Sequence, residues 1–190
     1  ARSLQAGLRL NPTAALDVRL QLLHDAPRPL TARTPVHLHL GTAEVVARVF
    51  PRAPIPPGGA GLARLICEAP LVARGGDRFV LRSYSPVSTI GGGVVVDPIP
   101  PRRRALWPDA LDSSSPRERL VALLLRHPPG ASSLSLAFRS GLPAAEVEVL
   151  LSGDDRVRLM PGEWVMASLV AAAPESALHT LSAFHHCEPA

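Results

Sequence analysis

Lysine is absent from this 190-residue sequence, and all 20 of its Lys or Arg positions are arginine. The phosphate-binding loop GxxxxGK[ST] needs a lysine, so no such loop occurs here. The patterns GxSxG, HExxH and CxxC, which mark common hydrolase, metalloprotease and redox or zinc sites, are absent as well. Asp77 follows a glycine and Asp97 precedes a proline, positions that favour local hydrogen bonds over acid–base catalysis. The sequence therefore favours a binding module over an enzyme.

Long apolar runs are also missing. No run reaches the ~20 apolar residues that a bilayer crossing needs, and the N-terminal ARSLQAGLRLNPT has no signal-peptide core. Of the two cysteines, Cys67 lies in a strand-like run and is expected to be a small buried hydrophobe, whereas Cys187 is far away in sequence. We expect a reduced, cytoplasmic protein with no membrane partner. Because the first residue is not methionine, we also expect a fragment of a longer protein.

Charge is distributed unevenly along the chain. Residues 1–104 hold 14 arginines against 6 carboxylates, a net charge of +8, whereas residues 105–190 hold 6 arginines against 10 carboxylates, a net charge of −4. A polyanion is therefore expected to bind the first part of the chain rather than the second. The alternative is that the arginines only keep a β surface soluble.

The most informative stretch is residues 73–98, ARGGDRFVLRSYSPVSTIGGGVVVDP. Its first half predicts a strand, because Phe79 and Leu81 alternate with Arg78, Val80 and Arg82. Residues 83–88 are turn formers, and TIGGGVVVDP predicts a second strand. Three glycines in a strand indicate the close approach of another backbone. Packing between strands of one barrel is the simpler explanation, and approach of a binding partner is the other.

Residues 16–101 together predict a small closed antiparallel β-barrel, because five or six short strands are separated by proline and glycine turns. In LDVRLQLL, starting at residue 16, one face is expected to be buried and the other exposed: Val18, Leu20 and Leu22 against Asp17, Arg19 and Gln21. In VHLHL, His37 and His39 face away from the apolar side chains. Two such histidines could hold a metal, but no third ligand is evident, so we favour histidines that face solvent or RNA.

Residues 102–115 predict a linker, in which Arg102, Arg103 and Arg104 either reach a phosphate backbone or are solvated. From residue 116 the apolar period becomes helical, with Ser115 as N-cap and a stripe of Leu120, Leu123 and Leu124. Helices ending before Pro128, Gly141 and Gly153, and then a hairpin around Pro161-Gly162, predict a winged helix over 116–170.

The third helix of this predicted winged helix carries Glu146 and Glu148 and no arginine. An acidic recognition helix repels phosphate, which favours a spacer or protein-contact unit over a nucleic-acid reader. Residues 171–190 predict the start of a second winged helix, with Leu178, Leu181 and Phe184 on one stripe. His185, His186 and Cys187 are adjacent on that helix and therefore face different ways, which disfavours a metal site.

The loop RSYSPVSTIGGG combines an arginine, hydroxyl groups and backbone amides, the groups that bind the phosphates and 2′-hydroxyls of duplex RNA. We expect Arg82 to pair with a phosphate, the hydroxyls to bond phosphate or ribose oxygens, and Tyr84 to pack on a sugar. Glycines would let the RNA approach. The predicted tRNA-binding residues are Arg74, Arg82, Ser83, Tyr84, Ser85, Thr89, Gly91 and Gly92.

The motifs GDRFVLR, SP, TIGGG and DP, with VHLHLGTAEVVARV upstream, resemble the third domain of the bacterial selenocysteine-specific elongation factors. That domain is similar to the last β-barrel of elongation factor Tu. The resemblance implies that the loop of Arg82, Ser83 and Tyr84 contacts the T stem of aminoacyl-tRNA. It is strongest over residues 36–104, and over 116–190 it depends on the order of elements.

The resemblance also implies partners and cofactors. The partners are selenocysteinyl-tRNA and, through the parent protein, the ribosome and the selenocysteine-insertion hairpin of an mRNA. GTP and magnesium are implied for an upstream GTPase domain of the parent, and no cofactor is expected in this chain. We expect the chain to be a monomer without enzymatic activity of its own.

A rival interpretation is a DNA-binding regulator, in which the winged helix reads a site and the barrel binds an effector or partner. The acidic third helix speaks against this interpretation. A structural adaptor without nucleic-acid contacts is a third hypothesis. The binding of duplex DNA compared with that of transfer RNA would distinguish them.

Overall fold

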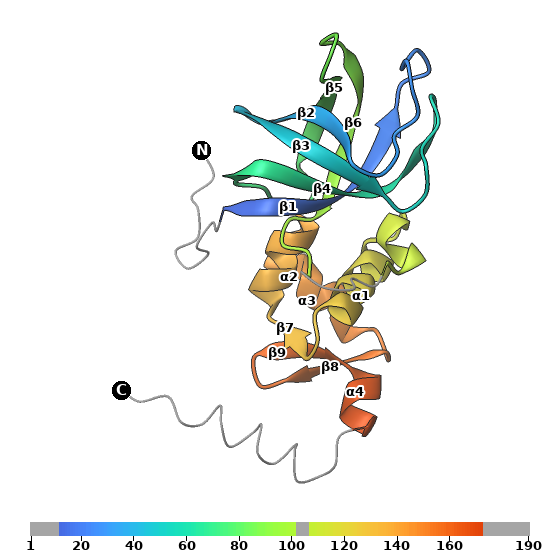
Figure 1. The fold of residues 1–190 in the computed structure, drawn as a ribbon. Coiled ribbons are helices and arrows are strands. Elements are labelled where there is room, and N and C mark those ends of the chain that lie inside the picture. Colours follow the sequence, from blue (N-terminus) through green and yellow to red (C-terminus); the bar gives the residue numbers. More distant parts are fainter. Residues whose placement is uncertain (1–11, 102–106, 173–190) are drawn as a thin grey trace. The chain divides into compact units, whose positions relative to one another are not determined.

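The computed structural model describes residues 12–101 and 107–172. The chain divides after Arg102 into two compact units, and the short stretch Phe138–Gly141 groups with the first. Six strands form most of the first unit, while the second is mainly helical with a small sheet (Figure 1). In the described part of the chain, no helix has the length and apolar character needed to span a membrane.

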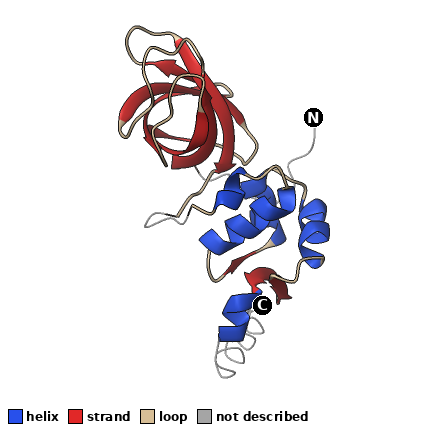
Figure 2. Ribbon diagram, turned by 90° about the vertical axis from the view of Figure 1, so that its right-hand side faces the viewer, coloured by secondary structure: helices blue, strands red, loops and turns tan. Residues whose placement is uncertain are grey.

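The first unit confirms the predicted closed antiparallel barrel. Hydrogen bonds join its strands in the order β1-β4-β3-β2-β5-β6, and Figure 2 shows them curving around a common centre. The strands are β1 (Thr13–Leu22), β2 (Thr34–Leu40), β3 (Ala43–Pro51), β4 (Ala60–Leu71), β5 (Arg78–Ser83) and β6 (Thr89–Asp97). The first strand starts before the predicted Leu16, because Thr13 already pairs with Leu71 although its neighbours show no apolar alternation.

Alternation along the strands fills the barrel with apolar side chains, as predicted. On β1, Val18, Leu20 and Leu22 are buried, and on β5 the buried pair is Phe79 and Leu81. Cys67 on β4 is also buried, and burial raises the pKa of its thiol to about 11. This cysteine is therefore a core residue, as the sequence indicates.

The prediction that Asp17 lies on the exposed face of β1 is wrong, because its side chain is fully buried. Its partner is Arg64, which lies directly opposite on β4. The guanidinium Nε donates to Oδ1 at 2.7 Å and Nη2 donates to Oδ2 at 2.9 Å. Strand alternation alone places Asp17 opposite the apolar face, but the cross-strand arginine is what permits its burial.

The two carboxylates at strand ends make the predicted local hydrogen bonds. Asp77 Oδ2 accepts from the backbone N–H of Arg74 at 2.7 Å. Asp97 Oδ1 accepts from the N–H of Ile99 at 3.1 Å. Both side chains therefore stabilise turns of the chain.

The glycine run of β6 lies between the backbones of β1 and β5. A Cβ atom on Gly92 would lie 2.6 Å from the carbonyl oxygen of Phe79, and one on Gly91 would meet the carbonyl oxygen of Gln21. The close approach that these glycines indicate is thus one between strands of the same barrel, the simpler of the two explanations. Contact of RNA with Gly91 or Gly92 stays a prediction.

Among its described residues, the second unit contains one 3-10 helix, four α-helices and a three-stranded sheet, in strand order β7-β9-β8. Its elements are a 3-10 helix η1 (Asp109–Asp112), α1 (Pro116–Arg126), β7 (Gly130–Ala131), α2 (Ser133–Ser140), α3 (Ala144–Ser152), β8 (Val157–Met160), β9 (Glu163–Met166) and a short α4 (Ala167–Ala172). This order confirms the predicted β-barrel followed by a winged helix. Ser115 caps α1 as predicted, accepting from the N–H of Glu118.

Three elements of this unit were not predicted. Strand β7 is too short to show a period, and η1 lies in the predicted linker although its Leu111 is buried. Helix α4 continues directly from β9, so residues 171 and 172 belong to this helix. The predicted features at Arg102–Arg104 and at 173–190, including Leu178, Leu181, Phe184, His185, His186 and Cys187, lie outside the described residues.

Candidate nucleic-acid interface

The loop between β5 and β6 is closed by the side chain of Ser83. Its hydroxyl donates to the carbonyl oxygen of Pro86 and accepts from the N–H of Ser88 at 3.0 Å. The backbone N–H of Ser83 also donates to the carbonyl of Ser88 at 2.8 Å. Ser83 therefore shapes the loop from inside, and residues 84–89 stay exposed around it.

Tyr84, the first exposed residue of this loop, lies flat against His37 of β2. The ring centroids are 5.3 Å apart and the ring planes differ by 12°. Tyr84 remains 54% exposed, so a large part of the aromatic side chain is available to a ligand. The stack fixes the start of the loop to the barrel wall.

Arg82 is the cross-strand neighbour of His37 and precedes Tyr84 by two positions. Its Nε is buried and has no hydrogen-bond partner among the described residues. Arg82 thus differs from Arg64, whose guanidinium is held by Asp17. A guanidinium without a carboxylate partner keeps its capacity to bind an anion.

Two histidines and a glutamate lie on the outer surface of β2 and β3, and of these His37 is directly opposite Arg82. Glu44 Oε1 is 3.5 Å from His37 Nδ1 and 3.8 Å from His39 Nε2. Both histidines face away from the core, as predicted. Among residues 12–101 and 107–172, no group of three or more His, Cys, Asp or Glu side chains has the arrangement of a metal site.

Gly91 and Gly92 lie within β6, opposite Leu81 and Val80, and the other six predicted site residues separate into two groups. Arg82, Ser83, Tyr84, Ser85 and Thr89 lie together at the β5–β6 turn, where Thr89 pairs with Arg82. Arg74 lies before the start of β5, at the opposite end of that strand, and its Nη2 donates to the carbonyl of Gly141 at 3.3 Å. The fold therefore does not bring Arg74 to the loop.

The sequence pattern predicted that His37 faces solvent or RNA, but it did not reveal the contact of His37 with Tyr84. Its outward orientation followed from alternation, but its position beside Arg82 and Tyr84 depends on the pairing of β2 with β5. No local pattern contains this pairing, since the two strands are separated by β3 and β4 in the chain. The candidate interface is therefore defined as His37, Arg82, Tyr84, Ser85 and Thr89, with Ser83, whose hydroxyl was predicted to bond RNA, holding the loop from inside.

The electrostatic balance of the barrel suits an anionic ligand. Residues 12–101 contain nine arginines against six carboxylates, and two of these carboxylates, Asp17 and Asp97, are fully buried. The exposed surface is accordingly more basic than the composition suggests. A surface of this kind attracts polyanions.

The closed barrel is matched by a known class of protein, the translation elongation factors. A family model described as "Selenocysteine-specific elongation factor, beta-barrel domain" matches residues 17–102. The chain is 30% identical over 155 residues to a selenocysteine-specific elongation factor of Desulfomicrobium baculatum, an alignment that covers 78% of this chain. It is 33% identical over 113 residues, or 60% of this chain, to the selenocysteine-specific elongation factor of Escherichia coli (strain K12).

The chain belongs to the family of selenocysteine-specific elongation factors. The alignment with the Desulfomicrobium protein covers more residues than the barrel contains, so the likeness extends into the second unit. This chain spans only 23% and 16% of the lengths of these two relatives. It therefore corresponds to a part of such a factor.

Proposed function

We propose that the candidate interface binds selenocysteinyl-tRNA as part of a selenocysteine-specific elongation factor. The observation that supports this proposal most directly is Arg82, which has no carboxylate partner among the described residues and lies beside the His37–Tyr84 stack. The family membership supports selenocysteinyl-tRNA as the RNA. The surface supplies the groups that would hold its backbone.

The chemistry of the interface suits the backbone of a duplex arm. Duplex RNA is recognised mainly through phosphates and 2′-hydroxyls, because its deep major groove hides the base edges. Arg82 would donate to a phosphate, and Ser85 and Thr89 offer exposed hydroxyls to phosphate or ribose oxygens. Tyr84 would pack against a ribose with the face that His37 does not cover.

The second unit has a different role in this proposal. Helix α3 contains Glu146 and Glu148 and no basic residue, so it repels phosphate. We therefore assign it a connecting role, leading from the tRNA-binding barrel toward the parts of the factor that hold the mRNA hairpin and contact the ribosome. GTP and magnesium are assigned to a GTPase domain of the whole factor, and hydrolysis is not assigned to these 190 residues.

A filter-binding comparison tests the proposal. Transfer RNA and a duplex DNA of equal phosphate number are titrated against the chain at the same salt concentration. We expect transfer RNA to bind at least about tenfold more tightly, because the interface is arranged for 2′-hydroxyls as well as phosphates. Equal affinity, or tighter binding of the DNA, would favour the rival DNA-binding regulator and contradict the proposal.

A further inference from the structure

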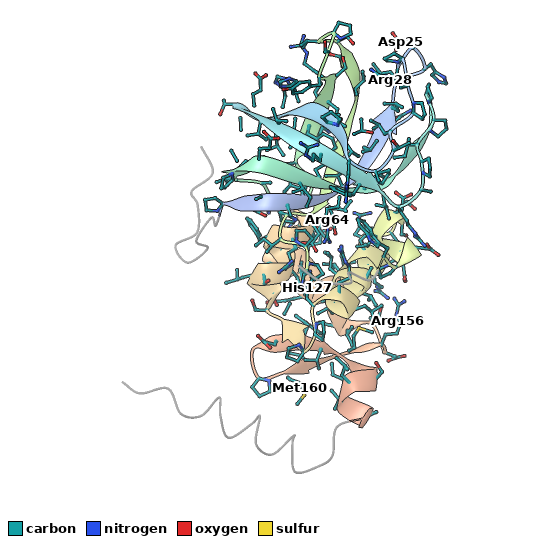
Figure 3. The ribbon with its side chains drawn as sticks, in the orientation of Figure 1. Asp25, Arg28, Arg64, His127, Arg156 and Met160 are labelled. Carbon is teal, nitrogen blue, oxygen red and sulfur yellow. The ribbon has the colours of Figure 1, made fainter. Side chains whose placement is uncertain are left out.

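A groove in the second unit lies where α3, α2 and the β8–β9 hairpin face one another. Its volume is about 650 Å³, within the size range of ligand-binding clefts. The residues that line it are Ser133, Glu148, Ser152, Leu159, Met160, Pro161, Gly162 and Trp164. Figure 3 marks the hairpin side of this groove with Met160.

The hairpin wall of the groove is apolar and partly exposed. Leu159 is 62% exposed, whereas Trp164 opposite it on β9 is buried. The indole N–H of Trp164 donates to the hydroxyl of Ser133 at 3.0 Å, which holds the ring in place. Leu159 is therefore the exposed apolar side chain of this wall, and it is able to receive an apolar side chain beside the fixed and largely covered ring of Trp164.

The helix wall carries a single charge. Glu148 is exposed, and its carboxylate has no hydrogen-bond or ion-pair partner among the described residues. The hydroxyl of Ser152 donates to the backbone carbonyl of Glu148 at 2.5 Å and is not directed to that carboxylate. In contrast, Glu118 and Asp154 in the same unit are both paired with Arg156.

No positive side chain of the described residues lines this groove. The nearest arginine along the hairpin, Arg158, donates to the backbone carbonyls of Asp155 and Val157, which holds its guanidinium near its own strand. An anionic ligand would therefore meet Glu148 without a compensating cation, and nucleic acid is disfavoured. An apolar wall beside an unpaired carboxylate is complementary to a cationic and partly apolar ligand.

We propose that the groove is a docking site for a basic peptide segment of a partner protein. An apolar side chain of the segment packs on Leu159 and the edge of Trp164, and a neighbouring arginine or lysine pairs with Glu148. Helices α3 and α2 each carry a further exposed apolar side chain, Val149 and Leu134, which lie outside the groove lining. The winged helix thus contacts protein through the face that related modules turn to nucleic acid.

A peptide titration on the full chain tests this proposal. Trp107 is replaced by Phe so that Trp164 is the remaining fluorophore, and a short synthetic peptide of alternating arginine and leucine is added. We expect a saturable change in Trp164 fluorescence. A matched peptide of alternating glutamate and leucine should give no saturation, because it opposes the charge of Glu148.

Charge reversal on α3 supplies a matched pair of variants. Glu148→Arg should weaken binding of the arginine–leucine peptide by about tenfold or more, as expected when one partner of a close charge pair is reversed. Glu146→Arg changes the same charge on the same helix, but residue 146 does not line the groove, and it should change the affinity by less than about twofold. Glu148→Gln, a milder change, should give an intermediate loss.

Several outcomes would overturn the proposal. Equal effects of Glu148→Arg and Glu146→Arg would show that only net charge matters. Equal binding of the glutamate–leucine peptide would show that the carboxylate has no role, and saturable Trp164 quenching by duplex RNA or DNA would identify a nucleic-acid site instead. Far-UV circular dichroism confirms that each variant is folded before it is scored.

Discussion

Arg64 of β4 holds the fully buried carboxylate of Asp17 of β1 through two parallel hydrogen bonds of 2.7 and 2.9 Å. A third bond runs from Arg64 Nη1 to the carbonyl of Pro101 at 3.0 Å. The pKa of Arg64 is raised, and the largest cause is its side-chain hydrogen bonding to Asp17. The pair joins two neighbouring strands and places a positive charge directly beside the buried carboxylate.

Removal of Arg64 should therefore destabilise the barrel. We expect Arg64→Met to lower the free energy of unfolding by about 3–5 kcal/mol, because the buried carboxylate of Asp17 loses the two hydrogen bonds and the positive charge of Arg64. The double variant Asp17→Leu with Arg64→Met should recover much of this loss, since no charge is then left unpaired. Hydrogen exchange of the barrel amides measures both effects. Equal destabilisation by the single and the double variant would contradict this account.

The buried position of Asp17 also shows what the sequence could not predict. Alternation along residues 16–22 located β1 and its apolar face correctly, because that pattern is a property of one strand. Burial of the other face depends on which strand lies alongside, and Arg64 is distant in sequence. The same limit applies to His37, whose stack on Tyr84 follows from the β2–β5 pairing.

In the second unit, local sequence patterns predicted the structure better than they predicted the strand pairing of the barrel. The N-cap at Ser115 and the Pro161-Gly162 turn predicted element boundaries well, because caps and turns are fixed by a few adjacent residues. The three glycines of β6 predicted a close backbone approach but could not identify the approaching strand. Strand pairing, and not local conformation, was therefore the main unknown.

The ion pair of Asp154 with Arg156 predicts a pH dependence of the second unit. Hydrogen bonds from Arg156 lower the pKa of Asp154 to about 2. The pKa of an Asp side chain in the unfolded chain is about 3.9, so the folded value is the lower one. Asp154 therefore contributes its full stabilisation above about pH 4, and this contribution is lost as the pH falls toward about 2. Arg156 also lowers the pKa of Glu118, which adds to the same trend.

Thermal unfolding followed by tryptophan fluorescence between about pH 5 and about pH 2 measures this dependence. The melting temperature of the second unit should fall over this range. Asp154→Asn should be less stable than the parent at about pH 5 and should show a smaller fall. An unchanged slope in Asp154→Asn would contradict the assignment to this pair.

The stack of Tyr84 on His37 predicts that the aromatic ring matters more for RNA binding than the hydroxyl. Tyr84→Phe should keep the stack and leave tRNA affinity within about twofold, while Tyr84→Ala should weaken it by about 1 kcal/mol or more, near the lower limit for aromatic contacts to nucleic acid. Filter binding at constant salt measures both affinities. A larger loss in Tyr84→Phe than in Tyr84→Ala would show that the ring is not the contact.

The role of Arg82 is tested most directly by comparing Arg82→Ala with Arg78→Ala, which removes the same charge from the same face of β5 about 13 Å away. Affinity for transfer RNA is measured over a range of salt concentrations. Arg82→Ala should lose about 1–3 kcal/mol of binding free energy. The slope of log affinity against log salt concentration should fall by the amount expected for about one phosphate contact. Arg78→Ala should change both the affinity and this slope little. An Arg82→Ala affinity equal to that of the parent at every salt concentration would contradict the proposed interface.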